Sequence, residues 1–223
     1  MDDFSLKGEK LQDALDKIAK INQFLGGNKL TLQGVRDLLA KVDPSKEITI
    51  VDLGCGNGDM LRLIAKYGKK SHLKFKLVGI DANIFTIEYA RELSQKHPNI
   101  QYLCEDIFGN AITNLKYDIV LLTLTLHHFK DNEIFDLLTT CNKNAKIGIV
   151  INDLHRSSIA YRLFQGICFI FCLNHISRED GLTSILRGFK KEELVPLSEK
   201  LNFKKYKIQW KWAFRYQWII SKV

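Results

Sequence analysis

The chain has 223 residues, of which 46% are hydrophobic and 26% charged, and its formal net charge is +8. This length and balance fit one globular domain with a sizeable core. They argue against a membrane-spanning protein, because the longest apolar run of interest, 167–173, is far shorter than the roughly 20 residues that a spanning helix needs. The start, MDDFSLKGEK, has no apolar segment typical of a signal peptide, so we expect a cytoplasmic protein.

The cysteines and the charge distribution narrow the function classes further. No CxxC pair and no nearby histidine at ligand spacing occurs, so we predict no metal site and reduced thiols at Cys55, Cys104, Cys141, Cys168 and Cys172. The positive excess lies largely in residues 190–223, where nine basic residues face three acidic ones. A solvated helix face and sheet edge is the simplest explanation, and a surface for RNA or an anionic membrane is the alternative.

Two amphipathic helices are predicted before the first strand. Apolar residues recur every three or four positions over 9–25, and we expect Gly26 and Gly27 to end that helix. A second helix is expected over 31–41. We interpret residues 1–47 as an N-terminal helical cap packed beside the site, although the same helices could merely cover one face of a sheet.

The segment 48–59, ITIVDLGCGNGD, joins a β-branched strand to three alternate glycines, Gly54, Gly56 and Gly58, and a helix start. Glycine lets the backbone approach a ligand, and a helix N-terminus favours electron-rich groups. This pattern predicts a nucleotide-like cofactor site; the alternative is a turn without chemical consequence. The pyridine-nucleotide pattern GxGxxG is not met, because Asp59 stands where its third glycine would be, and the GK[ST] of a P-loop is absent.

Helices and strands then alternate with short connections. Helices are expected over 60–68, 84–95 and 131–142, the last with Asp131 as N-cap, and strands over 75–80, 100–104, 117–122 and 146–151. This alternation predicts an α/β fold: a single Rossmann-like domain, 48–223, with a mostly parallel sheet and helices on both faces. The site should lie at the carboxyl ends of the strands. Asp81 ends the second strand, about 20 residues after the glycines, where a carboxylate binds ribose hydroxyls.

Five segments in order, VDLGCGNGD, VGIDAN, CEDIF, YDIVLLTLTLHHF and IGIVINDLHR, are similar to the motifs of class I S-adenosylmethionine-dependent methyltransferases. The resemblance implies S-adenosylmethionine as cofactor. It also implies a seven-stranded sheet, completed by two strands within 203–212 and 214–222. One departure is the stretch Lys143-Asn144-Ala145-Lys146, which stands where this family usually has a glycine-rich turn.

The resemblance also implies roles for residues at four strand ends. Asp52 would orient the ammonium of the methionine moiety, directly or through water. Asp81 would take the ribose hydroxyls, and Asp106 would accept from the adenine amino group. The residues implied beside the same ligand are Gly54, Cys55, Gly56 and Thr123 near the methionine arm and Ala82, Asn83 and Ile107 near the adenine.

A hydroxyl acceptor benefits from a general base, and histidine suits this role because its pKa lies near neutrality. Among the histidines after the fourth and fifth strands, we predict His155 as the base with Asp153 orienting it, and His128 as the second choice. Strand alternation indicates that His127 and His128 cannot both face the site. The alternative for each is a histidine that only bonds loop backbone.

A helical insertion, about 157–189, follows the fifth strand. An apolar stripe at helical spacing runs through Ile159, Leu163, Ile167, Ile170 and Phe171. It is either core or a lid over an apolar substrate. Residues 181–189 could return over the pocket and bring Arg187 near an acceptor oxygen, the alternative being a surface charge.

The order of NDLHR, the apolar helix, DGLTSILRGF and an aromatic C-terminal hairpin resembles the ubiquinone- and menaquinone-type small-molecule methyltransferases, some associated with type III polyketide synthases. It implies a small aromatic or polyketide-like acceptor, with O-methylation favoured over C-methylation, in a monomer or homodimer with possible interfacial membrane contact. The alternatives are an RNA or protein methyltransferase and a non-catalytic binding protein. RNA enzymes often carry [ND]PP[YF] where this chain has Leu124-Thr125-Leu126-His127, which makes a nucleic-acid partner the weaker reading.

Overall fold

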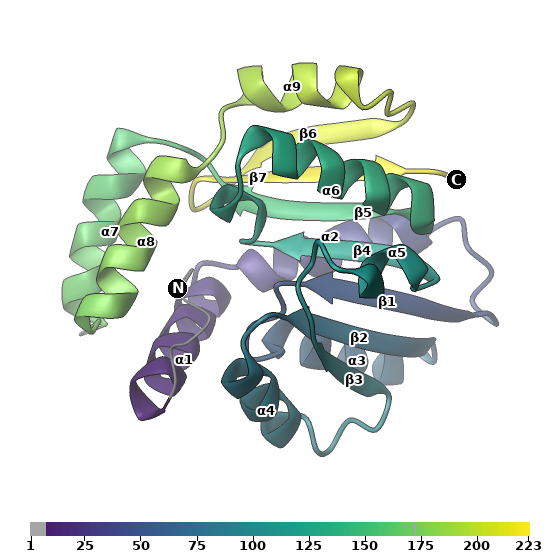
Figure 1. Cartoon of the computed structure of the whole chain (residues 1–223), viewed down its shortest axis with the longest axis horizontal. Helices are drawn as coiled ribbons and strands as arrows, with labels where there is room; N and C mark the ends of the chain where they lie inside the picture. The colour runs from purple at the N-terminus through teal and green to yellow at the C-terminus, as the bar shows by residue number, and fades with distance from the viewer. Residues whose placement is uncertain (1–7, 172) are drawn as a thin grey trace.

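The computed structural model describes residues 8–171 and 173–223 (Figure 1). The segment MDDFSLK and Cys172, one of the predicted reduced thiols, lie outside this part. The strands are β1 (Glu47–Leu53), β2 (Lys74–Asp81), β3 (Ile100–Cys104), β4 (Tyr117–Thr123), β5 (Ala145–Leu154), β6 (Tyr206–Lys211) and β7 (Arg215–Ser221). They form one sheet in the order β3-β2-β1-β4-β5-β7-β6. β7 is antiparallel to both of its neighbours and the other pairs are parallel, which confirms the predicted seven-stranded, mostly parallel sheet.

Helices surround this sheet. They are α1 (Glu9–Phe24), α2 (Gly27–Leu39), α3 (Asp59–Ser71), α4 (Ile84–Leu93), α5 (Asn110–Asn114), α6 (Asp131–Asn144), α7 (Ser158–Ile170), α8 (His175–Arg187), α9 (Lys191–Lys200) and the 3₁₀ turn η1 (Leu126–His128). In the described ranges, no helix has both the length and the apolar character needed to cross a bilayer.

The core has two layers because the central strands are buried on both faces. Along β1, Ile48 and Ile50 pack with residues of α2 and α3, whereas Val51 and Leu53 pack with residues of α6 and α9. Figure 1 shows α2 and α3 behind the sheet and α6 in front of it. A strand that faces two layers needs a nearly continuous apolar run, which explains why three of the four residues in 48–51, ITIV, are apolar.

The carboxyl ends of β1, β4 and β5 point toward α1, α7 and α8, at the left of Figure 1. α8 contacts α1, α7 and η1, so the N-terminal helix and the two helices after β5 meet over this edge. α2 instead packs against β5 and β7. Of the two N-terminal helices, therefore, α1 lies at the site edge and α2 covers a face of the sheet.

One predicted glycine stop is confirmed in part and another is wrong. α1 ends at Phe24, just before Gly26 turns the chain with a left-handed φ of 79°, but Gly27 is already the first residue of α2. Gly68 lies inside α3, which continues to Ser71 and ends where His72 adopts a left-handed φ of 56°. Glycine weakens a helix but does not end one whose neighbours pack well.

The start of α6 and the segment before α9 also differ from the prediction. Asp131 is the first helical residue, and Lys130 is the N-cap; its backbone N–H donates to the Glu133 carboxylate at 2.8 Å. Residues 181–187 belong to the regular helix α8 instead of a returning loop. Gly188 and Phe189 then close back on the sheet, where Phe189 forms a bridge with His155.

Candidate active site

A cavity of about 600 Å³ opens at the carboxyl ends of β1, β2 and β4. Residues of the glycine segment, of the loops after β2 and β3, and of α1 line it. It includes every residue that the resemblance assigned to the cofactor: Asp52, Gly54, Cys55, Gly56, Asp81, Ala82, Asn83, Asp106, Ile107 and Thr123. We refer to it as the cofactor cavity.

The glycine segment needs glycine for two separate reasons. At Gly56, with a φ of +51°, an added Cβ would meet nothing closer than Leu15 Cδ2 at 3.9 Å, so the backbone faces open cavity. At Gly58, with a φ of +75°, the same Cβ would lie 2.0 Å from the hydroxyl oxygen of Tyr102, a buried ring. One glycine therefore exposes backbone to a ligand and the other lets β3 pack behind the loop.

Asp81 joins the end of β2 to the glycine segment. Its Oδ2 accepts the N–H of Gly56 at 3.1 Å and its Oδ1 accepts the N–H of Asn83 at 3.0 Å. Burial raises the pKa of this carboxyl group, and the two N–H donors partly offset that rise. Each carboxylate oxygen accepts more than one hydrogen bond, so Asp81 can still accept two hydroxyls from a ligand in the cavity.

Asp52 is the least satisfied acid of the site. The residue is 2% exposed, and among the described residues its Oδ1 has no hydrogen-bond partner. Burial, followed by the nearby charges of Asp59 and Asp81, raises its pKa well above the usual value. A buried carboxylate without a partner is costly, and a cation in the cavity would remove that cost. The residues present therefore fit a ligand with an ammonium group.

This arrangement predicts proton release on cofactor binding. A bound ammonium favours the ionised form of Asp52, so the pKa of Asp52 should fall and affinity should rise with pH through its pKa in the free protein. Titration with S-adenosylmethionine by calorimetry at a series of pH values, in buffers of different ionisation enthalpy, should show release of up to one proton, and this release should fade as pH rises above the pKa of Asp52 in the free protein. The Asp52→Asn variant should release none. An identical apparent enthalpy in all buffers for the unmodified protein would contradict this role.

α1 closes over the glycine segment through polar contacts. Asp16 accepts hydrogen bonds from Asn57 Nδ2 at 3.2 Å and from the Tyr89 hydroxyl at 2.8 Å. At the start of α2, Asn28 Nδ2 donates to the Asp59 carboxylate at 2.6 Å. These contacts connect both N-terminal helices to the cofactor cavity. The amphipathic pattern of 9–25 showed the apolar face of α1 but not these partners.

Asp106 and Thr123 line the same cavity while bonding within the fold. Asp106 Oδ1 accepts the N–H of Phe108 at 2.9 Å, which shapes the loop after β3. The Thr123 hydroxyl lies 3.1 Å from the hydroxyl of Thr31 on α2. Both side chains thus hold the walls of the cavity in addition to facing it, and the ligand contacts implied for them remain predictions.

A second cavity, of about 490 Å³, adjoins the first. Ile18, Asn22, Leu124 and His128 line both, so the two cavities meet at these side chains. Residues of α1, α7, α8 and the loop before β7 form the rest of its wall, and most are apolar. We call this cavity the apolar chamber.

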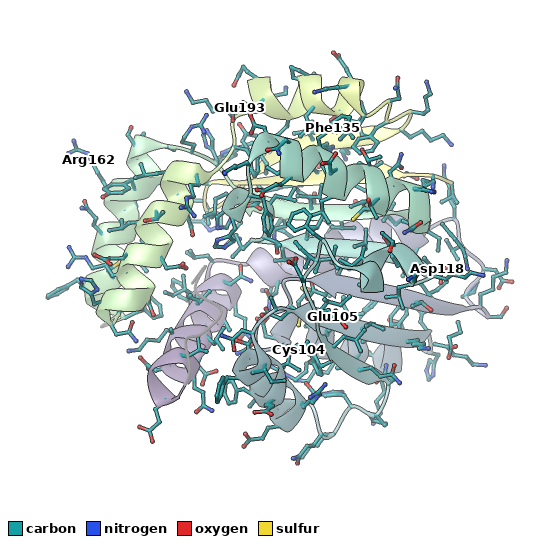
Figure 2. The ribbon with its side chains drawn as sticks, viewed as in Figure 1. Cys104, Glu105, Asp118, Phe135, Arg162 and Glu193 are labelled. Atoms are coloured by element: carbon teal, nitrogen blue, oxygen red, sulfur yellow. The ribbon has the colours of Figure 1, made fainter. Side chains whose placement is uncertain are left out.

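Three residues of the apolar stripe of α7, Leu163, Ile167 and Ile170, line this chamber and are not part of the buried core. Leu163 is 56% exposed and Ile170 is 73% exposed, although both line the chamber. Arg162 lies on the outer side of α7, pointing away from the sheet (Figure 2). The helix is therefore amphipathic, with an apolar side that no described part of the chain covers completely.

The expected pairing of Asp153 with His155 is wrong. Asp153, inside β5, holds His127: its Oδ1 lies 2.6 Å from His127 Nδ1. Burial by itself raises the pKa of Asp153, but the His127 ring and the Leu154 N–H outweigh it and keep the pKa below its usual value. His127 and His128 also lie in η1 and not in a strand, so both rings line the chamber, with centroids 4.2 Å apart.

His127 lines the chamber, and only one of its two ring nitrogens, Nδ1, is bonded to Asp153. Its Nε2 is buried and has no hydrogen-bond partner in the described part of the chain. An Nδ1–H that donates to Asp153 leaves the lone pair on Nε2, which is the arrangement of a base. Strand alternation does not predict this arrangement, because His127 and His128 lie in the turn η1.

His155 has different surroundings. Its Nδ1 accepts the indole N–H of Trp210 at 3.2 Å, and its ring packs against Phe214 and Tyr216. Burial is the main cause that lowers its pKa. Because the neutral ring then carries its proton on Nε2, the basic lone pair of His155 is already used. It lines the chamber as part of an aromatic wall.

The guanidinium on the chamber is that of Arg215 and not that of Arg187. Arg187 lies at the end of α8 with an exposed side chain and is not part of the chamber wall. Arg215, the first residue of β7, is 3% exposed and does line the chamber. β7 runs antiparallel to β5 and pairs Arg215 with Leu154, which places this arginine at the carboxyl edge of the sheet.

Residues 50–148 match a protein family described as a methyltransferase domain. The match runs from β1 into the first residues of β5. A related sequence is methyltransferase 235L of Invertebrate iridescent virus 6, whose activity is itself inferred: it is 31% identical over 147 residues, which are 66% of this chain and 47% of the viral protein. The chain thus spans about half the length of that relative.

Solved methyltransferases share the fold. The plantazolicin methyltransferase BamL, a complex with a triazolic desmethylPZN analogue and S-adenosylhomocysteine, superimposes with a TM-score of 0.71 at 14% identity, over 94% of this chain and 90% of BamL. Magnesium protoporphyrin IX methyltransferase of Synechocystis PCC 6803, with S-adenosylhomocysteine bound, gives 0.58 at 15% identity, over 88% and 84%. At these identities the likeness is one of fold. S-adenosylmethionine is the cofactor of this methyltransferase family.

Proposed function

We propose that this chain transfers a methyl group from S-adenosylmethionine to an oxygen of a small, largely apolar acceptor. One observation carries the proposal: the apolar chamber adjoins the cofactor cavity, with which it shares the lining side chains Ile18, Asn22, Leu124 and His128. A methyl group leaving the cofactor cavity there would enter the chamber. In-line transfer chiefly requires that the nucleophile be held about 3 to 3.5 Å from the methyl carbon in a dry pocket.

The chain's own residues would then perform three tasks. Asp52, Asp81 and the glycine backbone would hold the cofactor. The side chains of α1, α7 and α8 would orient the acceptor and exclude water. His127, polarised by Asp153, would take the proton of a hydroxyl acceptor on Nε2, so we propose His127 as the base in place of His155, with His128 at the junction of the two cavities. We also propose that the enzyme is related to the quinone- or polyketide-type small-molecule methyltransferases.

A macromolecular substrate is the second candidate. The lysines of residues 190–223 favour it, because they add positive charge along α9 and β6. None of these lysines lines the chamber or the cofactor cavity, so this charge does not converge on the site where the methyl group would be delivered. We therefore propose a small acceptor, a cytoplasmic monomer or homodimer and no nucleic-acid partner.

Release of S-adenosylhomocysteine tests the two candidates together. We expect turnover with phenols, quinols and alkylresorcinols, with 4-butylphenol used more efficiently than phenol because the butyl group fills apolar space. Total RNA and an unfolded protein should give no release above background. Turnover on RNA together with RNA binding that weakens steeply as salt rises would contradict the proposal.

A further inference from the structure

Arg215 presents to the apolar chamber a buried positive charge for which the described part of the chain supplies no ion-pair partner. The residue is 3% exposed, and within the described ranges neither Nε nor Nη1 has a hydrogen-bond partner. Burial lowers its pKa only to about 10, so the guanidinium stays charged at neutral pH. Buried charges are normally paired, because an unpaired one loses its hydration without compensation.

The surrounding acids do not supply that partner. Asp153 is near enough to favour the charged form of Arg215, but its Oδ1 bonds His127 and the Leu154 N–H, and its Oδ2 accepts the Leu126 N–H. Of the described ion pairs, none involves Arg215. The other ionisable groups on the chamber are Asp180, which has an interaction of its own, and the three histidines.

The backbone beside Arg215 adds to its positive potential. A Cβ built on Gly27, the first residue of α2, would lie 3.0 Å from the Arg215 Cζ and 1.9 Å from the Oδ1 of Asn22. The guanidinium therefore lies at the positive end of a 13-residue helix, next to a side chain that lines both cavities. A negative group bound there would lie near the junction through which the methyl group would pass.

We propose that Arg215 binds an oxyanion of the acceptor, so that the acceptor is an apolar molecule carrying either an ionised phenol or a carboxylate. This inference rests on the proposed function, because it takes the bound molecule to be the methyl acceptor. Binding of the anion itself does not depend on turnover. In the transfer step the S–C bond of the sulfonium breaks and an O–C bond forms, which neutralises both charges. A phenol first loses its proton to His127, whereas a carboxylate needs no base.

Calorimetry on the full chain saturated with S-adenosylhomocysteine tests the proposal with two matched probe pairs at pH 8. The carboxylate pair is 4-butylbenzoate and the neutral 4-butylbenzamide. The phenol pair is 4-butyl-2,6-difluorophenol, which is ionised, and the neutral 4-butylphenol. We expect the protein to prefer the anion of at least one pair about tenfold or more, as for a hydrogen bond to a charged group. The preferred pair identifies the source of the oxyanion.

Variants assign the preference to one side chain. Arg215→Met should lower the affinity for the preferred anion about 10- to 100-fold and leave the neutral probe within about twofold. Arg215→Lys should keep part of the preference, and Arg162→Met, on the outer side of α7, should keep all of it. Arg215→Met should fold with a melting temperature at or above that of the unmodified protein, because an apolar side chain of similar length replaces an unpaired charge.

Several results would overturn the inference: no preference for an anion, no measurable binding of either anion, or an unchanged preference in Arg215→Met. Failure of the proposed function looks different. If no phenol or acid is methylated but the anion preference depends on Arg215, the anion-binding site is supported and the proposed methyl transfer is refuted. If Arg215→Met methylates acceptors at the unmodified rate, the methyl transfer is supported and the oxyanion site is refuted.

Discussion

Replacing Asp81 with alanine should weaken S-adenosylmethionine binding by about 10²- to 10⁴-fold. Two ribose hydroxyls that donate to a carboxylate are together worth about 3–6 kcal/mol, since a hydrogen bond to a charged group contributes about 1.5–3 kcal/mol. The variant also loses the acceptor for the Gly56 and Asn83 N–H groups, which position the cofactor loop. Calorimetric titration of each variant measures the change.

Two controls separate a ligand contact from a folding defect. Asp118→Ala removes a carboxylate that also accepts a backbone N–H, from Thr49 at 2.8 Å, but at the opposite end of the sheet (Figure 2). It should leave the affinity for S-adenosylmethionine within about twofold. Asp81→Asn keeps the size and one acceptor oxygen, so its loss should be intermediate. An unchanged affinity in Asp81→Ala, with an intact circular dichroism spectrum, would remove Asp81 from the cofactor site.

Replacing His127 with alanine should lower kcat on a phenolic acceptor by about 10²- to 10⁴-fold, the usual contribution of a general base. Asp153→Asn should lower kcat in the same direction, because the amide no longer holds the His127 Nδ1–H in one orientation. Affinity for S-adenosylmethionine should change little in either variant, since neither side chain lines the cofactor cavity. Single-turnover kinetics with the best acceptor of the release screen measures both effects.

A comparison of two histidine variants distinguishes a base from a structural histidine. His155→Ala should keep most of the rate that His127→Ala loses, because the lone pair of His155 already accepts from Trp210. A full rate in His127→Ala on a phenol that is neutral at the assay pH would exclude it as the base.

The residues that line the cofactor cavity were predictable because the patterns that indicate them are local in the chain. The glycines, Asp52 and the helix start lie within 48–59, and Asp81 and Asp106 follow at strand ends where a parallel sheet brings them together. Parallel strands separated by helices leave few other arrangements of these ends. The family resemblance added the identity of the ligand.

The acceptor half depended on contacts between segments far apart in the sequence. Whether Asp153 bonds His127 or His155 depends on the geometry of η1. Residues 126–128 form a 3₁₀ turn, so the side-chain alternation of a strand does not apply to them. Whether the stripe of α7 is core or chamber wall depends on how α7 packs against α8, which periodicity cannot show.

By itself, then, the sequence determined the α/β sheet, the glycine-rich cofactor loop and the strand ends that face it, because each is specified by neighbouring residues. Only the tertiary structure decided which histidine meets Asp153 and which arginine meets the chamber. Arg215 reaches the site because β7 returns antiparallel beside β5 and pairs it with Leu154. That pairing joins residues far apart in the chain and buries the charge of Arg215. No local sequence pattern reveals that this charge needs a partner.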